Sequence, residues 1–265
     1  MLDTQKVLYA LSPVAFARDI LEFDPDPWQE KVLTWKDPRL ILNCCRQSGK
    51  STTTAALAVH EAVFNENSLI LLVSPSLRQS SELFRKVGHF LSMVDDVGLK
   101  EDNKLSLELG NGSRVVSLPS KEETIRGFSG ANLIIEDEAS RVDDDLYRAM
   151  RPMIAVSGGR IILMSTPFGK RGHFYEEWRR GVLWERVHIT AKQCPRISDQ
   201  FLQEELDSMG EWWFKQEYMG EFMESMDSVF TMEQIMSAMS EDVRPLVGAG
   251  AGYGSITSDI SPLEF

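Results

Sequence analysis

Residues 40–51 read LILNCCRQSGKS, an apolar run followed by a polar loop that ends in Gly49, Lys50 and Ser51. A segment that favours a helix continues from there through Leu57. Strand, loop and helix in this order are typical of a P-loop, whose backbone N–H groups wrap a phosphate at the helix N-terminus. In such a loop a lysine reaches the β- and γ-phosphate oxygens and a hydroxyl binds Mg²⁺. Lys50 and Ser51 are the predicted residues for these two contacts.

The loop departs from the general P-loop pattern at one position, because Cys44 stands where the consensus has glycine. The alternative to a P-loop is a chance turn, which the flanking strand and helix disfavour. The predicted nucleotide contacts of the loop and the first helical turn are Cys45, Arg46, Gln47, Ser48, Gly49, Lys50, Ser51 and Thr52.

A second apolar run, residues 131–139, reads ANLIIEDEA and ends in three carboxylates. An acidic strand end beside a P-loop typically supplies an Asp to the Mg²⁺ shell and a Glu that polarises the attacking water. We predict these roles for Asp137 and Glu138. Glu136 is expected to face away, since side chains alternate along a strand. The alternative, a solvated acidic turn, is disfavoured by the P-loop upstream.

A third apolar run, residues 160–164, ends in Ser165 and Thr166. Hydroxyls at that edge of a parallel sheet can contact the γ-phosphate or its water, so both residues are candidates for nucleotide binding. A plain turn at the end of a strand is the alternative.

The whole pattern alternates strands with helices, which predicts an α/β fold of the P-loop NTPase class (ASCE/RecA-like), a mostly parallel sheet with helices on both faces. Further strands are expected at 68–73 and 184–189, and a hairpin around Gly110 and Gly112. The expected domains are an ATPase core over 1–195 and a small helical lid or linker over 196–245. Residues 246–265 are rich in glycine at their start and are expected to be a flexible tail.

Three motifs together carry a family resemblance: RQSGKS at 46–51, IEDEA at 135–139 and STP at 165–167. Over residues 24–222 the chain resembles the ATPase motor domain of the large terminase subunit of tailed bacteriophages. The resemblance implies Mg²⁺-dependent ATP hydrolysis that moves double-stranded DNA into a procapsid. It also implies a portal protein and a small terminase subunit as partners, and a homo-oligomeric ring, a pentamer, when assembled. The isolated chain could instead be a monomer. In the resembled family a nuclease domain begins near residue 246, so residues 246–265 could instead be the truncated start of that domain, and no nuclease activity is expected.

The resemblance suggests roles for three further residues. It places an adenine-binding Gln at Gln29, although the spacing from Asp26 equally predicts a helix capping box. It places an arginine that acts in trans on a neighbour's ATP near Arg126, and pairing with nearby glutamates is the open alternative. Arg46, inside the P-loop, is expected to contact the phosphates of its own nucleotide.

The charge composition limits where the chain could contact DNA. The chain has 265 residues and a net charge of −12, and residues 199–242 hold twelve acidic residues and one lysine. A DNA contact should therefore use local basic residues, or these form only a solvated helix face. The candidates are Lys170, Arg171, Arg179 and Arg180. The sequence contains no run of about twenty apolar residues and no signal pattern, so we expect a soluble, cytoplasmic protein without a membrane. The resemblance implies that this is the host cytoplasm and that the protein acts at the procapsid portal.

Three cysteines, two adjacent and Cys194 distant, predict neither a disulfide framework nor a metal site, which fits a reducing compartment. Two rival functions remain. A helicase-like ATPase shares the first motifs but needs a second motor domain, for which the acidic helical region is too short. A nucleotide-binding assembly module with negligible hydrolysis would not need Glu138.

Overall fold

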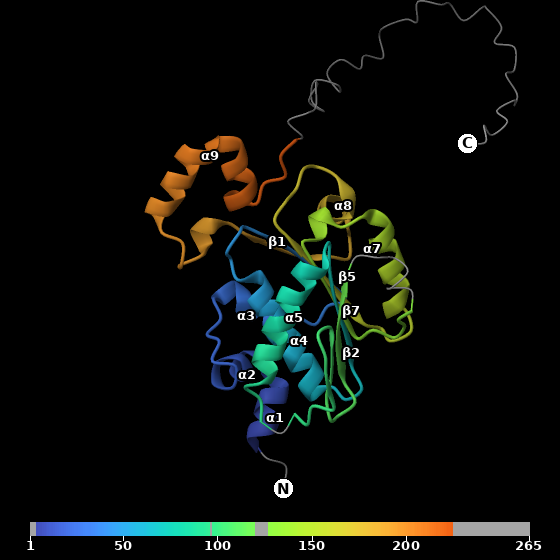
Figure 1. The fold of residues 1–265 in the computed structure, drawn as a ribbon. Helices are drawn as coiled ribbons and strands as arrows, with labels where there is room; N and C mark the ends of the chain where they lie inside the picture. Colours follow the sequence, from blue (N-terminus) through green and yellow to red (C-terminus); the bar gives the residue numbers. More distant parts are fainter. Residues whose placement is uncertain (1–3, 96, 120–126, 225–265) are drawn as a thin grey trace, which may run out of the picture. The chain divides into compact units, whose positions relative to one another are not determined.

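The computed structural model describes residues 4–95, 97–119 and 127–224 (Figure 1). The described chain as far as Met223 forms one compact unit. This unit contains the described part of the expected helical lid. The rest of that lid, the expected tail over 246–265, and Arg126 lie outside the described residues.

One sheet of eight strands organises this unit, in the order β3-β4-β5-β2-β6-β7-β1-β8. The strands are β1 (Arg39–Cys44), β2 (Leu69–Ser74), β3 (Glu101–Asp102), β4 (Ser106–Glu108), β5 (Arg114–Pro119), β6 (Leu133–Asp137), β7 (Arg160–Ser165) and β8 (Glu185–Ile189). The pairs from β5 to β8 are parallel, whereas β3, β4 and β5 are joined antiparallel at one edge. The predicted fold class and hairpin are thereby confirmed.

Helices join these strands and cover both faces of the sheet. They are α1 (Thr4–Leu11), α2 (Pro13–Asp19), α3 (Pro27–Leu33), α4 (Lys50–Phe64), α5 (Leu77–Leu91), α7 (Asp144–Met150), α8 (Gly172–Arg180) and α9 (Asp199–Met219). Short 3₁₀ turns follow three strands or helices: Ala139–Arg141, Arg151–Ile154 and Ala191–Gln193. Within the described ranges, no helix is both long enough and apolar enough to span a bilayer.

Local sequence explains where several helices begin and break. Ser12 caps α2 by accepting a hydrogen bond from the backbone N–H of Ala15 (3.2 Å), and Pro13 takes the first helical position. Asp26 and Gln29 form the predicted capping box at the start of α3. Helix α9 is interrupted at Gly210, whose φ of 79° lies in the left-handed region that glycine tolerates.

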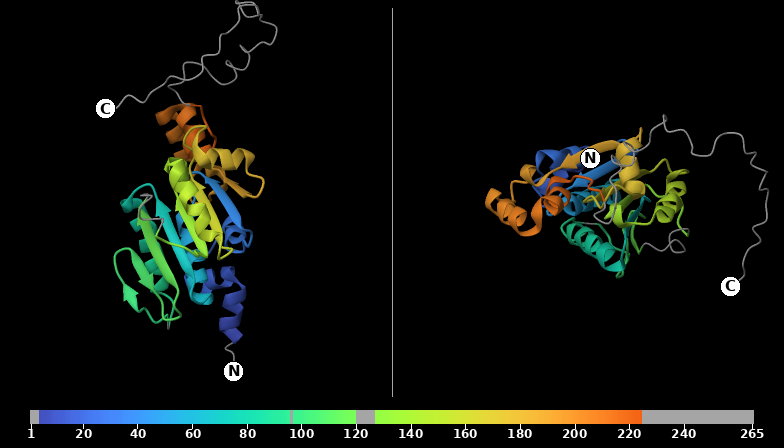
Figure 2. Two further views of the ribbon diagram at one scale, coloured as in Figure 1. Left: turned by 90° about the vertical axis from the view of Figure 1, so that its right-hand side faces the viewer. Right: turned by 90° about the horizontal axis from the view of Figure 1, so that it is seen from above.

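The two faces of β6 bury different layers, which positions the functional residues. Leu133 and Ile135 pack into the core that contains α4 and α5, whereas Ile134 packs into the core that contains α7 and α8. Figure 2 shows the two helical layers on opposite sides of the sheet. Because side chains alternate along a strand, Asp137 lies on the α4 face and Glu136 on the α8 face.

Candidate nucleotide-binding site

The predicted P-loop connects β1 to α4 and leaves a row of backbone donors free. Gln47 and Gly49 have φ values of 60° and 96°, and these left-handed residues turn the chain sharply into the helix. Among the described residues, none accepts a hydrogen bond from the backbone N–H groups of residues 47–51. Successive free N–H groups at a helix N-terminus form an anion site, so this loop is suited to a phosphate.

The residues at the two ends of the loop differ from this central row. The N–H of Cys45 donates to the carbonyl of Ile189 (2.8 Å), and the N–H of Arg46 donates to the carbonyl of Glu217 (3.0 Å). The Arg46 guanidinium also forms an ion pair with the Glu217 carboxylate, although its side chain is largely exposed. Thr52 donates its N–H to Gly49. The free backbone donors are therefore limited to residues 47–51.

Lys50 forms the link between the P-loop and the acidic strand end. Its Nζ lies 3.0 Å from Oε1 of Glu138, and the lysine is 9% exposed. Burial lowers the pKa of Lys50, but the charges of Glu138 and Asp137 outweigh this and raise it above its usual value. Lys50 is therefore charged and is held beside the carboxylates at the end of β6.

Asp137 and Glu138 occupy the end of β6 and the turn after it. Burial raises the pKa of Asp137 to about 6. The positive charge of Lys50 opposes this shift, and the negative charge of Glu138 adds to it. Glu138 has a left-handed backbone (φ 54°), which is uncommon for a residue with a side chain, and its N–H donates to the Asp137 carboxylate (3.0 Å). The turn thus places Asp137 and Glu138 side by side at one strand end, near the charge of Lys50.

This donor set suits Mg²⁺ held together with phosphates rather than by protein alone. In the described part of the chain, no group of three or more His, Cys, Asp or Glu side chains could hold a metal ion. Mg²⁺ is commonly bound through one or two carboxylates, retained waters and the oxygens of a substrate phosphate. A buried carboxylate at Asp137 and the hydroxyl of Ser51 at the start of α4 fit that requirement.

The end of β7 brings hydroxyls to the same place. The Oγ atoms of Ser165 and Ser140 lie 2.7 Å apart, and Ser165 Oγ lies 3.5 Å from Oε2 of Glu138. The hydroxyl of Thr166 is buried, and no described residue pairs with it. A buried polar group without a partner is costly unless a ligand or water satisfies it. Ser165 and Thr166 therefore lie near Glu138, and the buried hydroxyl of Thr166 is available to a ligand or water.

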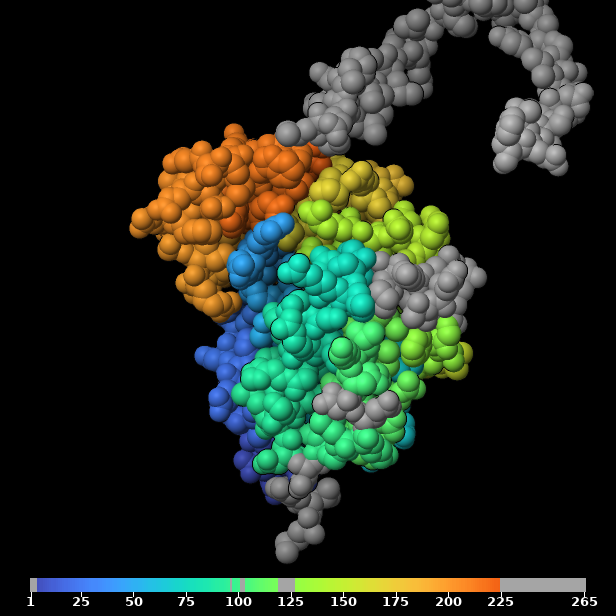
Figure 3. All heavy atoms as spheres, in the orientation of Figure 1, coloured from blue at the N-terminus to red at the C-terminus, as the bar shows by residue number. Residues whose placement is uncertain are grey.

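A cleft of about 770 Å³ opens over the P-loop, and several of its lining residues are not among the predicted nucleotide contacts. Helix α9 (orange in Figure 3) lies beside the P-loop region (blue) and closes one side of it. Residues 47–52 form the floor, and the further side chains from α5, α9 and the segment before α9 include Lys86, Arg196, Phe201 and Tyr218. Lys86 Nζ lies 3.3 Å from the hydroxyl of Thr52. These residues come together only through tertiary packing.

Gln29 does not line this cleft. It is 1% exposed, and its Oε1 accepts a hydrogen bond from the N–H of Asp26 (2.8 Å). Its amide nitrogen faces Gly49 so closely that a Cβ there would lie 2.7 Å from it. The contacts of Gln29 are those of its capping role and of support for the P-loop, and its contact with adenine stays a prediction.

The third cysteine is close to the P-loop despite its distance in sequence. Sγ of Cys194 lies 3.8 Å from Sγ of Cys45, and both thiols are buried. Burial also raises the pKa of Cys44 to about 12, so that thiol is protonated. All three cysteines are free thiols. Because Cys45 and Cys194 are far apart in the sequence, nothing in the sequence indicated this contact.

Glu136 faces away from the P-loop, as predicted, and is completely buried on the opposite face. Its Oε2 lies 3.1 Å from Nε2 of His173 on α8, whose Nδ1 lies 3.2 Å from Asp144 on α7. The ring of His173 also stacks on Tyr147 at 4.4 Å. This Glu136–His173–Asp144 cluster joins the catalytic strand to both helices on that face.

Two of the basic residues predicted for DNA are already paired. Arg179 and Arg180 both lie within 3.6 Å of Glu176 on their own helix. Arg171 instead lies over the ring of Phe168, at 5.0 Å from its centre. Arg171 therefore has the less neutralised cation.

Comparison with known proteins gives consistent results. The family model for the terminase large subunit, T4-like virus type, N-terminal, matches residues 41–237. The large terminase ATPase domain of Thermus phage P74-26 superimposes with a TM-score of 0.69 and 20% identity, covering 80% of this chain and 100% of that one. The large terminase of bacteriophage HK97 gives 0.64 and 16%, covering 80% and 55%.

The large terminase of another thermophilic bacteriophage, solved in complex with ADP, gives a TM-score of 0.65 and 15% identity, covering 74% of this chain and 53% of that one. The chain thus spans about half the length of this terminase and of the HK97 protein. At these identities the structures show a shared fold, while the family model matches well over half of the chain. The chain therefore belongs to the T4-like family of terminase large subunits, the DNA-packaging motors of bacteriophages, and corresponds to their N-terminal ATPase domain.

Proposed function

We propose that this chain binds ATP with Mg²⁺ at the P-loop and hydrolyses it, and that hydrolysis drives double-stranded DNA into a procapsid. The observation that carries the proposal is the contact of Lys50 with Glu138 at 3.0 Å. It joins the two motifs that an ATPase needs at one sheet edge, beside five free backbone N–H groups. Family membership supports the motor role.

In this proposal the lysine changes partner when nucleotide binds. The β- and γ-phosphates would take the free N–H groups of residues 47–51 and attract Lys50 from Glu138. Ser51 and Asp137 would hold Mg²⁺, which neutralises phosphate charge when bound. Glu138, released from the lysine, could then accept a proton from the attacking water. Ser165 and Thr166, beside Glu138, would contact the γ-phosphate side.

In this proposal the adenine base and the ribose occupy the remaining part of the cleft. Phe201 is 42% exposed in that cleft and lies edge-on to Tyr218, with ring centroids 6.1 Å apart. An exposed aromatic face beside a phosphate site suits stacking with adenine. We expect Phe201→Ala to weaken ATP affinity by about tenfold with little change in turnover at saturation. A titration with a fluorescent ATP analogue measures this, and an unchanged affinity would place the base elsewhere.

The assembled motor requires parts beyond this chain. We propose a homo-oligomeric ring that meets a portal protein and a small terminase subunit, and an Arg126 that acts in trans on the ATP of a neighbour. Mixing Arg126→Ala with Lys50→Ala subunits tests the trans role, since each would supply what the other lacks at a shared interface. No recovery of turnover in co-assembled protein would argue for a role in cis.

Release of phosphate, measured with and without double-stranded DNA, tests the proposed function directly. We expect Mg²⁺-dependent turnover that chelation with EDTA abolishes and that DNA increases. Nucleotide binding without turnover, in both the isolated and the assembled state, would favour a non-hydrolysing assembly module. Nuclease activity is not part of the proposal.

Lys50→Ala is expected to weaken ATP binding strongly, by about a hundredfold, because it removes the buried cation from the phosphate site. Isothermal titration with a non-hydrolysable ATP analogue measures the change. Lys86→Ala is the matched control, since Lys86 contributes one cation at the more exposed rim of the same cleft. Equal affinity of wild type and Lys50→Ala would contradict the P-loop assignment.

A further inference from the structure

We infer that Arg141, Phe168 and Arg171 form a binding site for the phosphate backbone of double-stranded DNA, and that this site is linked to the catalytic glutamate. The inference rests on the proposed function for the identity of the ligand. Its evidence is separate, because these three residues lie outside the nucleotide cleft and have no role in the proposed ATP chemistry.

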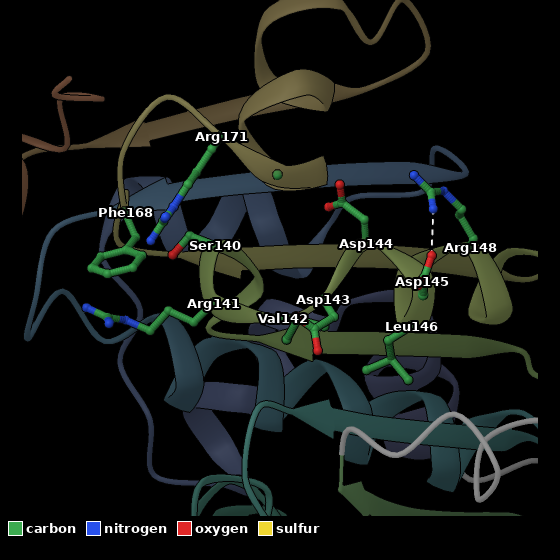
Figure 4. A pocket seen from close by; sticks show the side chains of 11 residues that line it. Ser140, Arg141, Val142, Asp143, Asp144, Asp145, Leu146, Arg148, Phe168 and Arg171 are labelled. Atoms are coloured by element: carbon green, nitrogen blue, oxygen red, sulfur yellow. Dashed lines mark hydrogen bonds and ion pairs between the residues drawn. The ribbon is translucent and has the colours of Figure 1, made fainter. Parts of the chain in front are cut away.

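The three side chains form a stacked arrangement. The guanidinium carbon of Arg141 lies 3.9 Å from the centre of the Phe168 ring, and that of Arg171 lies 5.0 Å from the same centre. Figure 4 shows the ring between the two guanidinium groups. Stacking uses the flat faces of a guanidinium and leaves its N–H groups free at the edges. The ring therefore fixes two cations without using their hydrogen-bond donors.

Both cations lack a carboxylate partner within residues 4–95, 97–119 and 127–224. Most other exposed arginines in this region are paired, as are Arg148 with Asp145 (2.6 Å) and Arg196 with Asp26 (2.7 Å). In a chain of net charge −12, these two exposed arginines share one aromatic ring and have no such pairing. They are available for an anionic ligand.

The same pocket also contains three carboxylates, of which Asp144 and Asp145 lie apart from the arginine pair. The pocket has a volume of about 980 Å³ and runs from Phe168 toward α7. Figure 4 shows Asp144 and Asp145 at the other end from Phe168, with Asp143 between. Asp145 is paired with Arg148, and Asp144 accepts from the N–H of His173 (2.6 Å). A polyanion could therefore contact the Phe168 end, with Asp143 as the carboxylate between it and the partnered Asp144 and Asp145.

Short covalent and hydrogen-bonded paths join this end to the catalytic centre. Arg141 directly follows Ser140, whose Oγ lies 2.7 Å from Ser165 Oγ and donates to the carbonyl of Thr166 (2.8 Å). Ser165 in turn approaches Glu138 (3.5 Å), and Phe168 comes two residues after Thr166. A ligand that moved the arginine pair would thus move the hydroxyls that contact Glu138.

A nucleic-acid backbone fits these groups better than an acidic protein surface. Two forked donors on neighbouring segments can bind two phosphates of one strand. The apolar side chains that line the pocket, Val142, Leu146 and Phe168, are few for a protein interface. Contact with phosphates alone carries no base preference, as a motor that moves any sequence requires.

The test compares two double variants of the full chain that each remove two arginines. Arg141→Ala with Arg171→Ala removes the proposed site, and Arg179→Ala with Arg180→Ala removes the same charge from α8, where both arginines pair with Glu176. Binding to a fluorescent duplex of about 30 base pairs is measured by anisotropy across a salt series. We expect the first variant to bind about tenfold or more weakly, with a salt slope smaller by about 2, and the second to change little.

Phosphate release without DNA should be equal in wild type and the first variant, while its stimulation by DNA is lost. Phe168→Leu keeps an apolar side chain but removes the stacking face, so it should lower DNA affinity in part, with an unchanged melting temperature. Equal DNA affinity of the first variant and wild type, equal losses in the two double variants, or lower turnover without DNA would each overturn the inference. So would a wild-type chain that does not bind DNA, or a first variant that loses only self-association. A wild type without turnover would instead refute the proposed function, because the binding comparison does not require hydrolysis.

Discussion

Replacing Glu138 by Gln is expected to slow ATP hydrolysis by about 10²- to 10⁴-fold while ATP remains bound. Gln fills the same space but cannot accept a proton from water as a carboxylate does. Lys50 now pairs with Glu138 at 3.0 Å, so the variant also removes an ion pair that nucleotide must break. We therefore expect ATP affinity to be equal or higher in Glu138→Gln.

Two measurements separate these effects: phosphate release at saturating ATP, and a binding titration with a fluorescent ATP analogue. Glu217→Gln is a matched control, because it makes the same chemical change in a carboxylate that pairs with Arg46 at the edge of the P-loop. That control should retain turnover within a few-fold of wild type. Wild-type turnover in Glu138→Gln would refute the catalytic role, and a joint loss of binding and turnover would indicate a structural one.

The sheet and the motifs at its edge were predictable because their signals are local. The apolar runs before Asn43 and before Asp137 are short and continuous, as expected for parallel strands buried on both faces. Each run is followed by residues for which we propose a role in binding or hydrolysing ATP. The capping box at Asp26 and the break of α9 at Gly210 also follow from nearby residues.

The walls of the nucleotide cleft were not predictable for the opposite reason. Arg196, Phe201 and Tyr218 reach the P-loop from about 150 residues further along the chain, and no spacing rule connects them. The same holds for Cys194 beside Cys45. The sequence also offered Arg179 and Arg180 on α8 either as DNA contacts or as part of a solvated helix face. Both are exposed, and both pair with Glu176 within one helix. Pairing between side chains depends on rotamers and packing, which a linear pattern does not contain.

Replacing His173 by Ala is expected to destabilise the protein by about 3 kcal/mol or more, because it leaves Glu136 buried without its cationic partner. Glu136 is completely buried, and its Oε1 has no hydrogen-bond partner among the described residues. Denaturation by urea measures the change in unfolding free energy. His89→Ala is the control, since His89 is exposed at the end of α5 and should cost well below 1 kcal/mol.

The loss of stability in His173→Ala should also depend on pH, and the groups around His173 decide the direction of that dependence. Burial lowers the pKa of His173, but Glu136 from β6 and Asp144 from α7 outweigh it and raise the pKa above 6.5, while Tyr147 stacks on the ring without charge. The stabilisation is therefore fully present below about pH 6.5 and is lost as pH rises through the folded-state pKa. The difference between wild type and His173→Ala should be larger near about pH 6 than near about pH 9. Glu136→Ala combined with His173→Ala should cost less than the sum of the single changes, because the double variant leaves no unpaired buried charge. A difference that stays constant with pH, together with additive costs, would show that His173 contributes packing alone.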